Sequence, residues 1–174
     1  WKAKGLDVLL RAIARISGGG RSVRLRVVGD GPERRALEGL SARLGIQELV
    51  TFTGFASRDE VRAAMWSARA LVLPSRRETF GLVLAEALAC GLPVVATRCG
   101  GPESFVRAPY GKVVPPDDEA ELAAALVDTL NACSPALSEQ AREYAVAEFG
   151  PSVFQARLEK VYGAVESHVS PPRR

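Results

Sequence analysis

The sequence predicts an α/β protein with a doubly wound parallel sheet, and three observations support this fold class. Short apolar runs alternate with longer amphipathic segments along all 174 residues. Glycine and proline separate many of these segments, as expected for short loops. Apolar residues make up 47% of the chain, which is enough to fill the core of a single domain. Such alternation implies βαβ crossovers and a sheet with helices on both faces.

Short β-prone runs predict five strands, at residues 23–28, 50–53, 69–73, 93–97 and 111–114. Apolar residues at helical spacing predict helices at residues 5–17, 33–44, 58–67, 81–90 and 118–131. A short helix is expected at residues 103–106, and two more, at 138–148 and 151–167, are expected after a break at Pro135. Residues 1–167 are therefore expected to form one domain, and residues 168–174 a frayed tail.

Charge and hydropathy exclude two classes of partner. The formal net charge is only +3, basic and acidic residues are interleaved, and no aromatic-rich strand is available to stack bases, so no nucleic acid is expected to bind. No apolar stretch approaches the roughly 20 residues that cross a bilayer, and the start of the chain has no signal-peptide pattern. We expect a cytoplasmic protein without a transmembrane segment, peripheral to a membrane only through a longer parent.

The cysteines and the single histidine limit the chemistry. Cys90, Cys99 and Cys133 are widely spaced and form no C-x-x-C motif, which is typical of reduced, mostly buried thiols in the cytoplasm. His168 is the only histidine and lies near the end of the chain. A Ser-His or Cys-His nucleophile and a histidine metal site are therefore excluded. We expect neither a metal site nor a cofactor.

Two carboxylates eight positions apart flank a predicted helix start. Glu78 lies in the loop after the strand at residues 69–73, and Glu86 lies well inside the helix that begins near Gly81. A helix start offers unpaired N–H groups and attracts phosphate, and a glycine there lets a diphosphate approach the backbone. Eight helical residues span roughly 12 Å, on the order of the distance from a ribose through a pyrophosphate to a hexose. An isolated pair at this spacing more often consists of two ordinary exposed glutamates near a helix N-terminus. The surrounding residues therefore decide whether the pair indicates a binding site.

Those residues resemble a known family. The segment PSRRETFGLVLAEALACGLPVVAT, at residues 74–97, is similar to the donor-nucleotide signature of retaining glycosyltransferases of the GT-B fold, of the group 1 or family 4 type. Four more phrases follow the family order: KGLDVLLRAIARI, LRVVGDGP, VTFTGF and YGKVVPPDDEAELAAAL. The resemblance implies a Rossmann-like domain, one half of a GT-B fold, that binds a nucleoside diphosphate sugar.

The resemblance also implies roles for individual residues. Glu86 matches the glutamate that holds the ribose hydroxyls, and Glu78 matches the one that faces the donor sugar. Lys4 matches a lysine that neutralises the diphosphate, so Glu78 and Lys4 are the candidate catalytic residues. The diphosphate itself would be held by backbone amides around Phe80, Gly81 and Leu82.

Two further loops belong to the implied donor cleft. Gly29 and Gly31 would line it, and the backbone near Phe55 and Ala56 would read the base, although a phenylalanine in such a place is as often part of the core. The Gly29-Asp30-Gly31 sequence is also placed like a dinucleotide fingerprint. Arg34, however, stands where that fingerprint requires its third glycine or alanine, and no matching ribose-binding acid follows, which disfavours a nicotinamide enzyme.

The resemblance further implies a missing strand. In the family, a strand ending in V-G-R precedes the helix that begins at Lys4-Gly5, and its arginine shares the diphosphate with the lysine. That strand is central in the sheet, and here Trp1 stands only three residues before Lys4. We expect an open position in the sheet, filled in a longer parent, closed by the flanking strands, or occupied by a neighbouring chain through strand exchange. The N-terminal acceptor domain of the parent is expected to be a partner.

Three interpretations remain at this point. The first is the donor-binding half of a retaining, metal-independent hexosyltransferase, which alone would bind nucleotide without catalysing transfer. The second is a non-catalytic nucleotide-sugar-binding or scaffold module derived from such an enzyme. The third, a GT-B epimerase, needs acid–base residues that the sequence does not offer. Neither the base, the sugar nor the acceptor can be predicted from these residues.

Overall fold

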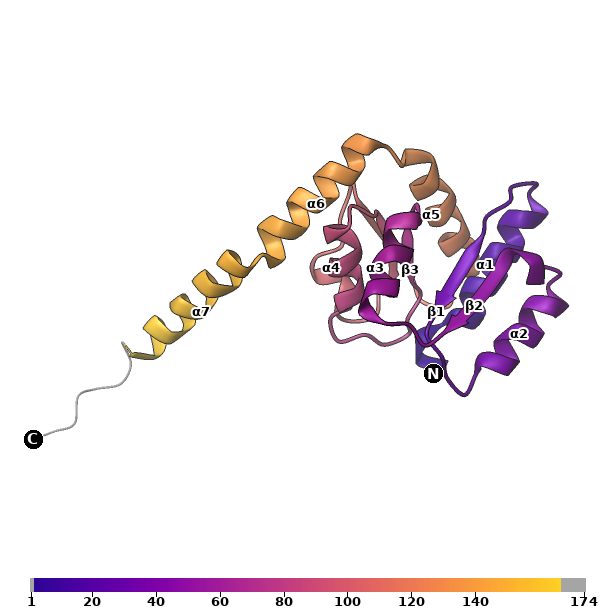
Figure 1. The fold of residues 1–174 in the computed structure, drawn as a ribbon, viewed down its shortest axis with the longest axis horizontal. Helices are drawn as coiled ribbons and strands as arrows, with labels where there is room; N and C mark the ends of the chain where they lie inside the picture. Colours follow the sequence, from indigo (N-terminus) through magenta and orange to yellow (C-terminus); the bar gives the residue numbers. More distant parts are fainter. Residues whose placement is uncertain (1, 167–174) are drawn as a thin grey trace, which may run out of the picture.

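The computed structural model describes residues 2–166, and their fold is the predicted α/β class. Five short parallel strands alternate with helices along the chain (Figure 1). The strands are β1 (Leu25–Val28), β2 (Val50–Gly54), β3 (Leu71–Leu73), β4 (Val94–Thr97) and β5 (Gly111–Val114). All five predicted strands are therefore present, and the predicted tail at residues 168–174 lies outside the described residues.

The helices agree with the apolar periodicity. They are α1 (Leu6–Gly18), α2 (Arg34–Arg43), α3 (Arg58–Ser67), α4 (Leu82–Ala89), α5 (Glu119–Ala132), α6 (Pro135–Phe149) and α7 (Pro151–Glu166), with short 3-10 turns η1 (Lys2–Lys4), η2 (Gln47–Leu49) and η3 (Pro102–Ser104). Two predictions were wrong in detail. The short helix expected at residues 103–106 is the single turn η3, and α6 begins at Pro135 rather than at residue 138. Proline is well suited to the first helical position, where its missing N–H costs nothing, and the Ser134 hydroxyl caps the helix by accepting from the Leu137 amide.

Helices cover both faces of the strands, as the alternation of buried residues in β4 shows. Val95 packs in a core with α1, α2 and α5, whereas Val94 and Ala96 pack in a second core with α3, α4 and α6. Side chains of a strand point alternately to its two faces, so a strand buried on both sides is apolar throughout. All four residues of β4 are buried, which identifies it as an interior strand.

The five strands do not form one continuous sheet. β1 pairs only with β2, while β3, β4 and β5 form a separate three-stranded sheet in that order. Between β1 and β3 lies a groove of about 1030 Å³, lined by both strands and by apolar side chains such as Leu9, Ile13 and Val72. The expectation of an open position in the sheet is confirmed: the described strands beside it have not closed together.

The N-terminal end of the described chain lies at one end of this groove, next to the carboxyl end of β3. Lys2 and Lys4 line the groove, and Gly5 sits against Pro74, the residue that follows β3. Gly5 has φ +62°, and any side chain there would collide with the Pro74 carbonyl oxygen. A glycine is therefore required where the chain passes from η1 into α1.

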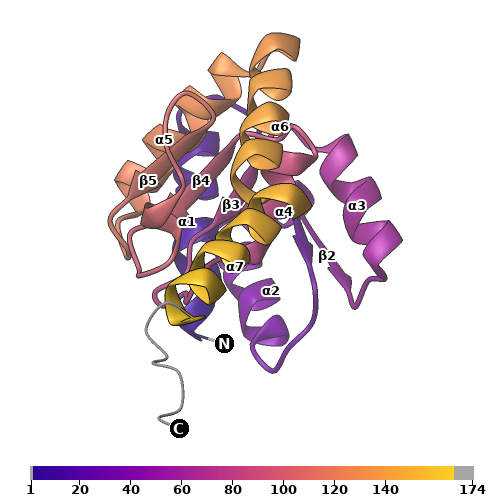
Figure 2. The ribbon, with the colours of Figure 1, turned by 90° about the vertical axis from the view of Figure 1, so that its left-hand side faces the viewer.

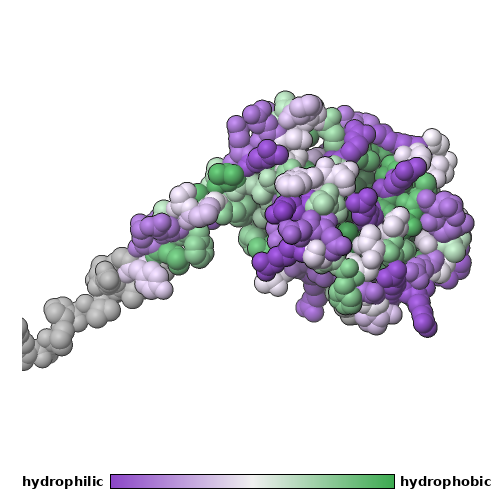
Figure 3. All heavy atoms as spheres, in the orientation of Figure 1, coloured by the Kyte–Doolittle hydropathy of each residue, from purple (hydrophilic) through white to green (hydrophobic). Residues whose placement is uncertain are grey.

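The C-terminal helix α7 projects away from the body of the domain (Figure 1), and it lies in front of that body when the molecule is viewed from this side (Figure 2). Large aromatic side chains remain exposed along it, including Phe154 and Tyr162. Figure 3 shows green, hydrophobic atoms on the projecting part of the molecule. No helix in residues 2–166 is both long and apolar enough to serve as a membrane span. The three cysteines are free, as expected, but each is half-buried rather than mostly buried.

Candidate functional site

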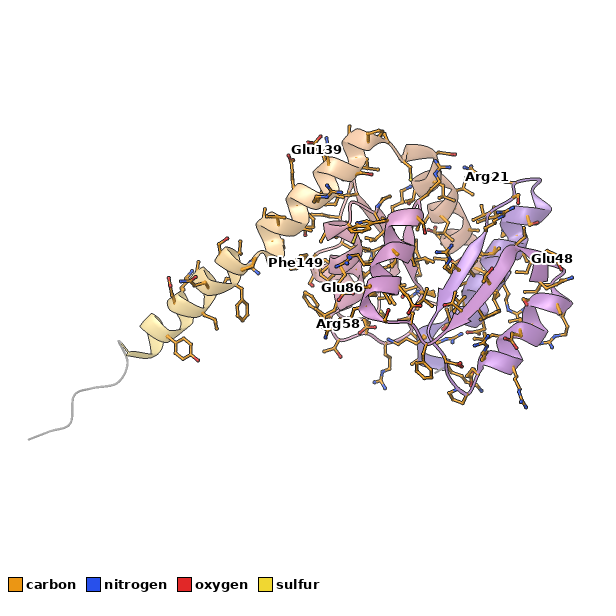
Figure 4. All side chains as sticks on the ribbon, in the orientation of Figure 1. Arg21, Glu48, Arg58, Glu86, Glu139 and Phe149 are labelled. Carbon is orange, nitrogen blue, oxygen red and sulfur yellow. The ribbon has the colours of Figure 1, made fainter. Side chains whose placement is uncertain are left out.

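The residues singled out in the sequence lie in loops at the carboxyl ends of the strands, where parallel α/β sheets place their ligand sites. Gly29 and Gly31 follow β1, Phe55 and Ala56 follow β2, and residues 74–81 follow β3. Figure 4 labels Glu86 on α4, the helix that continues from the last of these loops. The loops after three of the five strands thus carry the candidate residues at the carboxyl ends of the strands.

The start of α4 offers backbone donors. Gly81 caps the helix in a left-handed conformation, with φ 90° and ψ 50°, which favours glycine. Within residues 2–166, nothing accepts a hydrogen bond from the amides of Phe80, Gly81 or Leu82. Three consecutive N–H groups without an acceptor at a helix start give a region of positive potential suited to an anion.

The ring of Phe80 helps to fix this helix start. It stacks on Phe105 with ring centroids 4.9 Å apart and meets Phe149 edge-on at 5.9 Å. Phe149, labelled in Figure 4, ends α6 at its junction with α7. The side chain of Phe80 therefore packs on two other rings while the residue remains 38% exposed.

Glu78 and Lys4 contact each other directly. The Lys4 Nζ donates to Glu78 Oε2 at 2.9 Å, with the two side chains 50% and 19% exposed. The residues are 74 positions apart in sequence, and the contact joins η1 to the β3–α4 loop. The structure thus brings the two candidate catalytic residues together.

The backbone of Glu78 is held by the loop that follows β4. Its amide donates to the Cys99 carbonyl at 3.3 Å, and its own carbonyl accepts from the Gly101 amide at 2.8 Å. Glu103 in turn accepts from the Cys99 and Gly100 amides at 3.0–3.2 Å, and backbone donors, first its own amide, lower the pKa of this carboxyl group. This second layer around Glu78, which includes Glu103, was not identified from the sequence.

Glu86 is the fifth residue of α4 and is exposed, and its side chain forms no hydrogen bond or ion pair with the rest of residues 2–166. An ionised carboxylate can only accept hydrogen bonds, so it is free to take them from hydroxyl groups of a ligand.

The β1 loop is fixed by Arg34, which holds three groups at once. Its guanidinium donates to Asp30 at 3.1 Å, to Glu38 at 2.8 Å and to the Phe52 carbonyl at 3.1 Å. Asp30 in addition accepts from the Gly31 amide at 2.7 Å. The residue that breaks the dinucleotide fingerprint therefore ties the β1 loop to β2.

The loop after β2 presents Phe55 to solvent, because its side chain is 89% exposed. The alternative that this residue belongs to the core is therefore wrong. Ala56 beside it is half-buried, and Ser57 begins α3 through a capping box with Glu60.

The structure does not place all candidate residues around one cavity. The groove between β1 and β3 is lined by Lys4, Gly29 and Gly31, whereas Glu78, Glu86 and the α4 start lie outside it. The Lys4–Glu78 ion pair links the two parts. The candidate residues thus lie in two adjoining parts of an open surface, and they do not surround one enclosed pocket.

Arg76, two residues before Glu78, has a role that the sequence did not reveal. It forms a two-pronged ion pair with Asp7, at 2.9 and 2.8 Å, and donates through Nε to Asp117 at 2.7 Å. Its guanidinium is therefore not simply solvated, because two carboxylates already neutralise its charge. The neighbouring Arg77 is exposed and forms no ion pair with any other described residue.

The Arg76 pair predicts a pH dependence of stability. Hydrogen bonds from Arg76 hold the pKa of Asp7 below its ordinary value of 3.8. Because the folded-state pKa is depressed, the stabilisation is fully present above pH 3.8 and is lost as the pH falls through the lower folded value. We expect Asp7→Asn to reduce the free energy of unfolding by about 1 kcal/mol at pH 7, since the pair is partly solvated.

Urea denaturation of both proteins between pH 7 and pH 2.5 measures this difference, which should shrink below pH 3.8. Asp59→Asn, at a carboxylate whose side chain is 83% exposed, is the control and should change little. A difference for Asp7→Asn that stays constant over the whole range would contradict the expected linkage.

Comparisons with known proteins place the chain in a family. Residues 1–132 match the model of the family described as "Glycosyl transferases group 1". The 2-deoxystreptamine glucosyltransferase of Streptomyces kanamyceticus is 36% identical over 154 residues, which cover 84% of this chain and 39% of that protein. This chain thus spans well under half the length of that relative.

Comparison with solved structures supports the same family. Sucrose-phosphate synthase from Thermosynechococcus elongatus matches 97% of this chain and 44% of its own, with a TM-score of 0.83 and 31% identity. Anabaena HepE, crystallised in complex with UDP, matches 94% of this chain and 46% of its own, with a TM-score of 0.82 and 25% identity. The family match, the neighbours in structure and the GT-B-type half-fold lead to one conclusion: the chain belongs to the group 1 glycosyltransferases.

Proposed function

We propose that this chain is the donor-binding domain of a retaining hexosyltransferase that uses a nucleoside diphosphate sugar. The observation that carries the proposal is the α4 start, where the free amides of Phe80, Gly81 and Leu82 lie between Glu78 and Glu86. The UDP complex of the HepE relative supports a nucleotide ligand. Glu86 accepts hydrogen bonds from the ribose hydroxyls, and Glu78 faces the hexose.

The chemical contribution of the domain is electrostatic. When the bond from the anomeric carbon to the diphosphate breaks, negative charge grows on the leaving phosphate oxygens. The ammonium group of Lys4 and the α4 amides are the donors that stabilise this charge, so the proposed mechanism uses protein groups and no metal ion. Gly29 and Gly31 keep side chains out of the way of the diphosphate, and the backbone of Phe55 and Ala56 contacts the base.

The remaining parts of the enzyme belong to a longer parent. An N-terminal domain of that parent would bind the acceptor and exclude water, so the 174-residue chain alone binds nucleotide but transfers no sugar. The parent also supplies the strand that fills the groove between β1 and β3; exchange of a strand with a second chain is the alternative. We place the parent in the cytoplasm, where nucleoside diphosphate sugars are made available to such enzymes.

Calorimetry with UDP, GDP and ADP tests the proposal. The wild-type chain should bind at least one of the three. Glu86→Ala should weaken that binding roughly tenfold to hundredfold, because hydrogen bonds to a charged group contribute about 1.5–3 kcal/mol.

The matched control is Glu139→Ala. Glu139 is exposed and is the fifth residue of α6, as Glu86 is of α4, and Figure 4 labels both. This substitution should leave affinity unchanged. Failure of the wild type to bind any of the three nucleotides, or equal affinity of the two variants, would reject the assignment.

A further inference from the structure

Arg76 joins three segments at the carboxyl ends of the strands. Besides Asp7 in the first turn of α1 and Asp117 in the β5–α5 loop, its guanidinium donates to the Lys2 carbonyl in η1. Its backbone amide donates to the Ala3 carbonyl at 2.6 Å. One residue of the β3–α4 loop thus fixes both the entry into α1 and the start of α5.

The geometry of this junction is specific to arginine. The two terminal nitrogens engage both oxygens of Asp7, while Nε engages a different carboxylate. A planar guanidinium with donors on two edges can satisfy this set, whereas a lysine ammonium cannot. Asp117 has φ 60°, unusual for a residue other than glycine, and its carboxylate accepts from Arg76 Nε at 2.7 Å.

The two candidate catalytic residues are attached directly to this junction. Lys4 follows the pair of carbonyls that Arg76 binds, at Lys2 and Ala3, and Glu78 lies two residues beyond Arg76 itself. Their side chains meet at 2.9 Å. Because Lys4 is 50% exposed on a short 3-10 turn, the junction fixes the backbone from which its side chain starts, while Glu78 holds the ammonium group itself.

We propose that Arg76 is a positioning residue that holds Lys4 for the donor diphosphate, with Asp7 and Asp117 as its anchors and without touching the ligand itself. The inference rests on the proposed function. Without the Arg76 guanidinium, η1 loses its restraint at the Lys2 carbonyl, and the backbone that carries Lys4 must be ordered at the moment of binding, which costs affinity for the diphosphate.

The test separates positioning from general structure by comparing two ligands. Calorimetry measures the affinity for the best-bound nucleoside diphosphate and for its monophosphate, in wild type, Lys4→Met, Arg76→Met, Arg76→Lys, the double variant Lys4→Met/Arg76→Met, and the control Arg77→Met. We expect Lys4→Met to weaken diphosphate binding about tenfold and to reduce the preference over the monophosphate by the same factor. Arg76→Met should reproduce most of this loss, and the double variant should be no weaker than Lys4→Met alone.

The conservative variant distinguishes positioning from direct phosphate contact. Arg76→Lys keeps the charge but loses the planar guanidinium that binds two carboxylates at once, so it should behave like Arg76→Met. Rescue by lysine, or additive losses in the double variant, would mean that Arg76 binds phosphate itself and would overturn the proposal. Equal losses for both ligands would indicate a purely structural role and would also overturn it.

Arg77→Met should bind both ligands as the wild type does, because the removed charge is adjacent but takes no part in the junction. A wild type that binds no nucleotide at all defeats the proposed function, and this inference with it. A wild type that binds, together with an Arg76→Met variant that binds the diphosphate equally well, defeats the inference alone.

Discussion

Gly101→Ala is expected to destabilise the domain by about 2–4 kcal/mol and to abolish tight nucleotide binding together with it. An added Cβ would lie 2.5 Å from both the Phe80 amide nitrogen and the Thr79 carbonyl oxygen, and closer still to the Phe80 Cα. These are backbone atoms and cannot rotate away. Because the Gly101 amide also donates to the Glu78 carbonyl, the strain falls on the segment that carries the α4 amides.

Urea denaturation and calorimetry on the same protein measure both effects. Gly18→Ala is the matched control, since Gly18 ends α1 and has no heavy atom within 4 Å of an added Cβ. That change should be neutral or should stabilise the chain by up to about 1 kcal/mol. A Gly101→Ala protein as stable as the Gly18→Ala protein would show that the two loops are not packed as described.

The second large effect is expected in hydrogen exchange beside the groove. Leu71 donates its amide to the Pro93 carbonyl on the β4 side. Alternate residues of a parallel strand direct their N–H and C=O groups to opposite sides, so Val72 directs both toward the groove. We expect the Val72 amide to exchange orders of magnitude faster than the Leu71 amide in the 174-residue chain.

A longer version of the chain that carries an additional N-terminal strand should slow the exchange at Val72 and leave Leu71 unchanged. It should also raise the melting temperature, because two sheets then become one and buried backbone groups gain partners. Protection of Val72 that increases with protein concentration would instead indicate strand exchange between copies. Slow exchange at Val72 in dilute short chain would contradict the open position altogether.

Elements with local signals were predicted well from the sequence. The run Leu71–Leu73 before Pro74, and the glycine that starts α4, follow from turn residues and periodicity within a few positions. The start of α6 was wrong because Pro135 has two local meanings: it can break a helix or begin one. The Ser134 hydroxyl favours the second meaning, and the serine preceding a proline was an available signal that was not used.

The contacts that organise the site were not predictable in the same way. Arg76 and Asp7 are 69 positions apart, and Arg76 and Asp117 are 41 apart, so no pattern within a sequence window joins them. Arg76 and Arg77 are also indistinguishable as letters, although one is tied to two carboxylates and the other is exposed. Only the fold, which brings three loops to one edge, separates their roles.

The contact between Lys4 and Glu78 has a consequence for the order of events in the proposed site. In the structure the ammonium group of Lys4 donates to one oxygen of the Glu78 carboxylate, Oε2. Under the proposed function, a diphosphate would compete with Glu78 for this ammonium group and would leave Oε2 open to a hydroxyl of the hexose. Binding of the donor would thus be coupled to the opening of this ion pair, because the diphosphate and the carboxylate compete for one ammonium group.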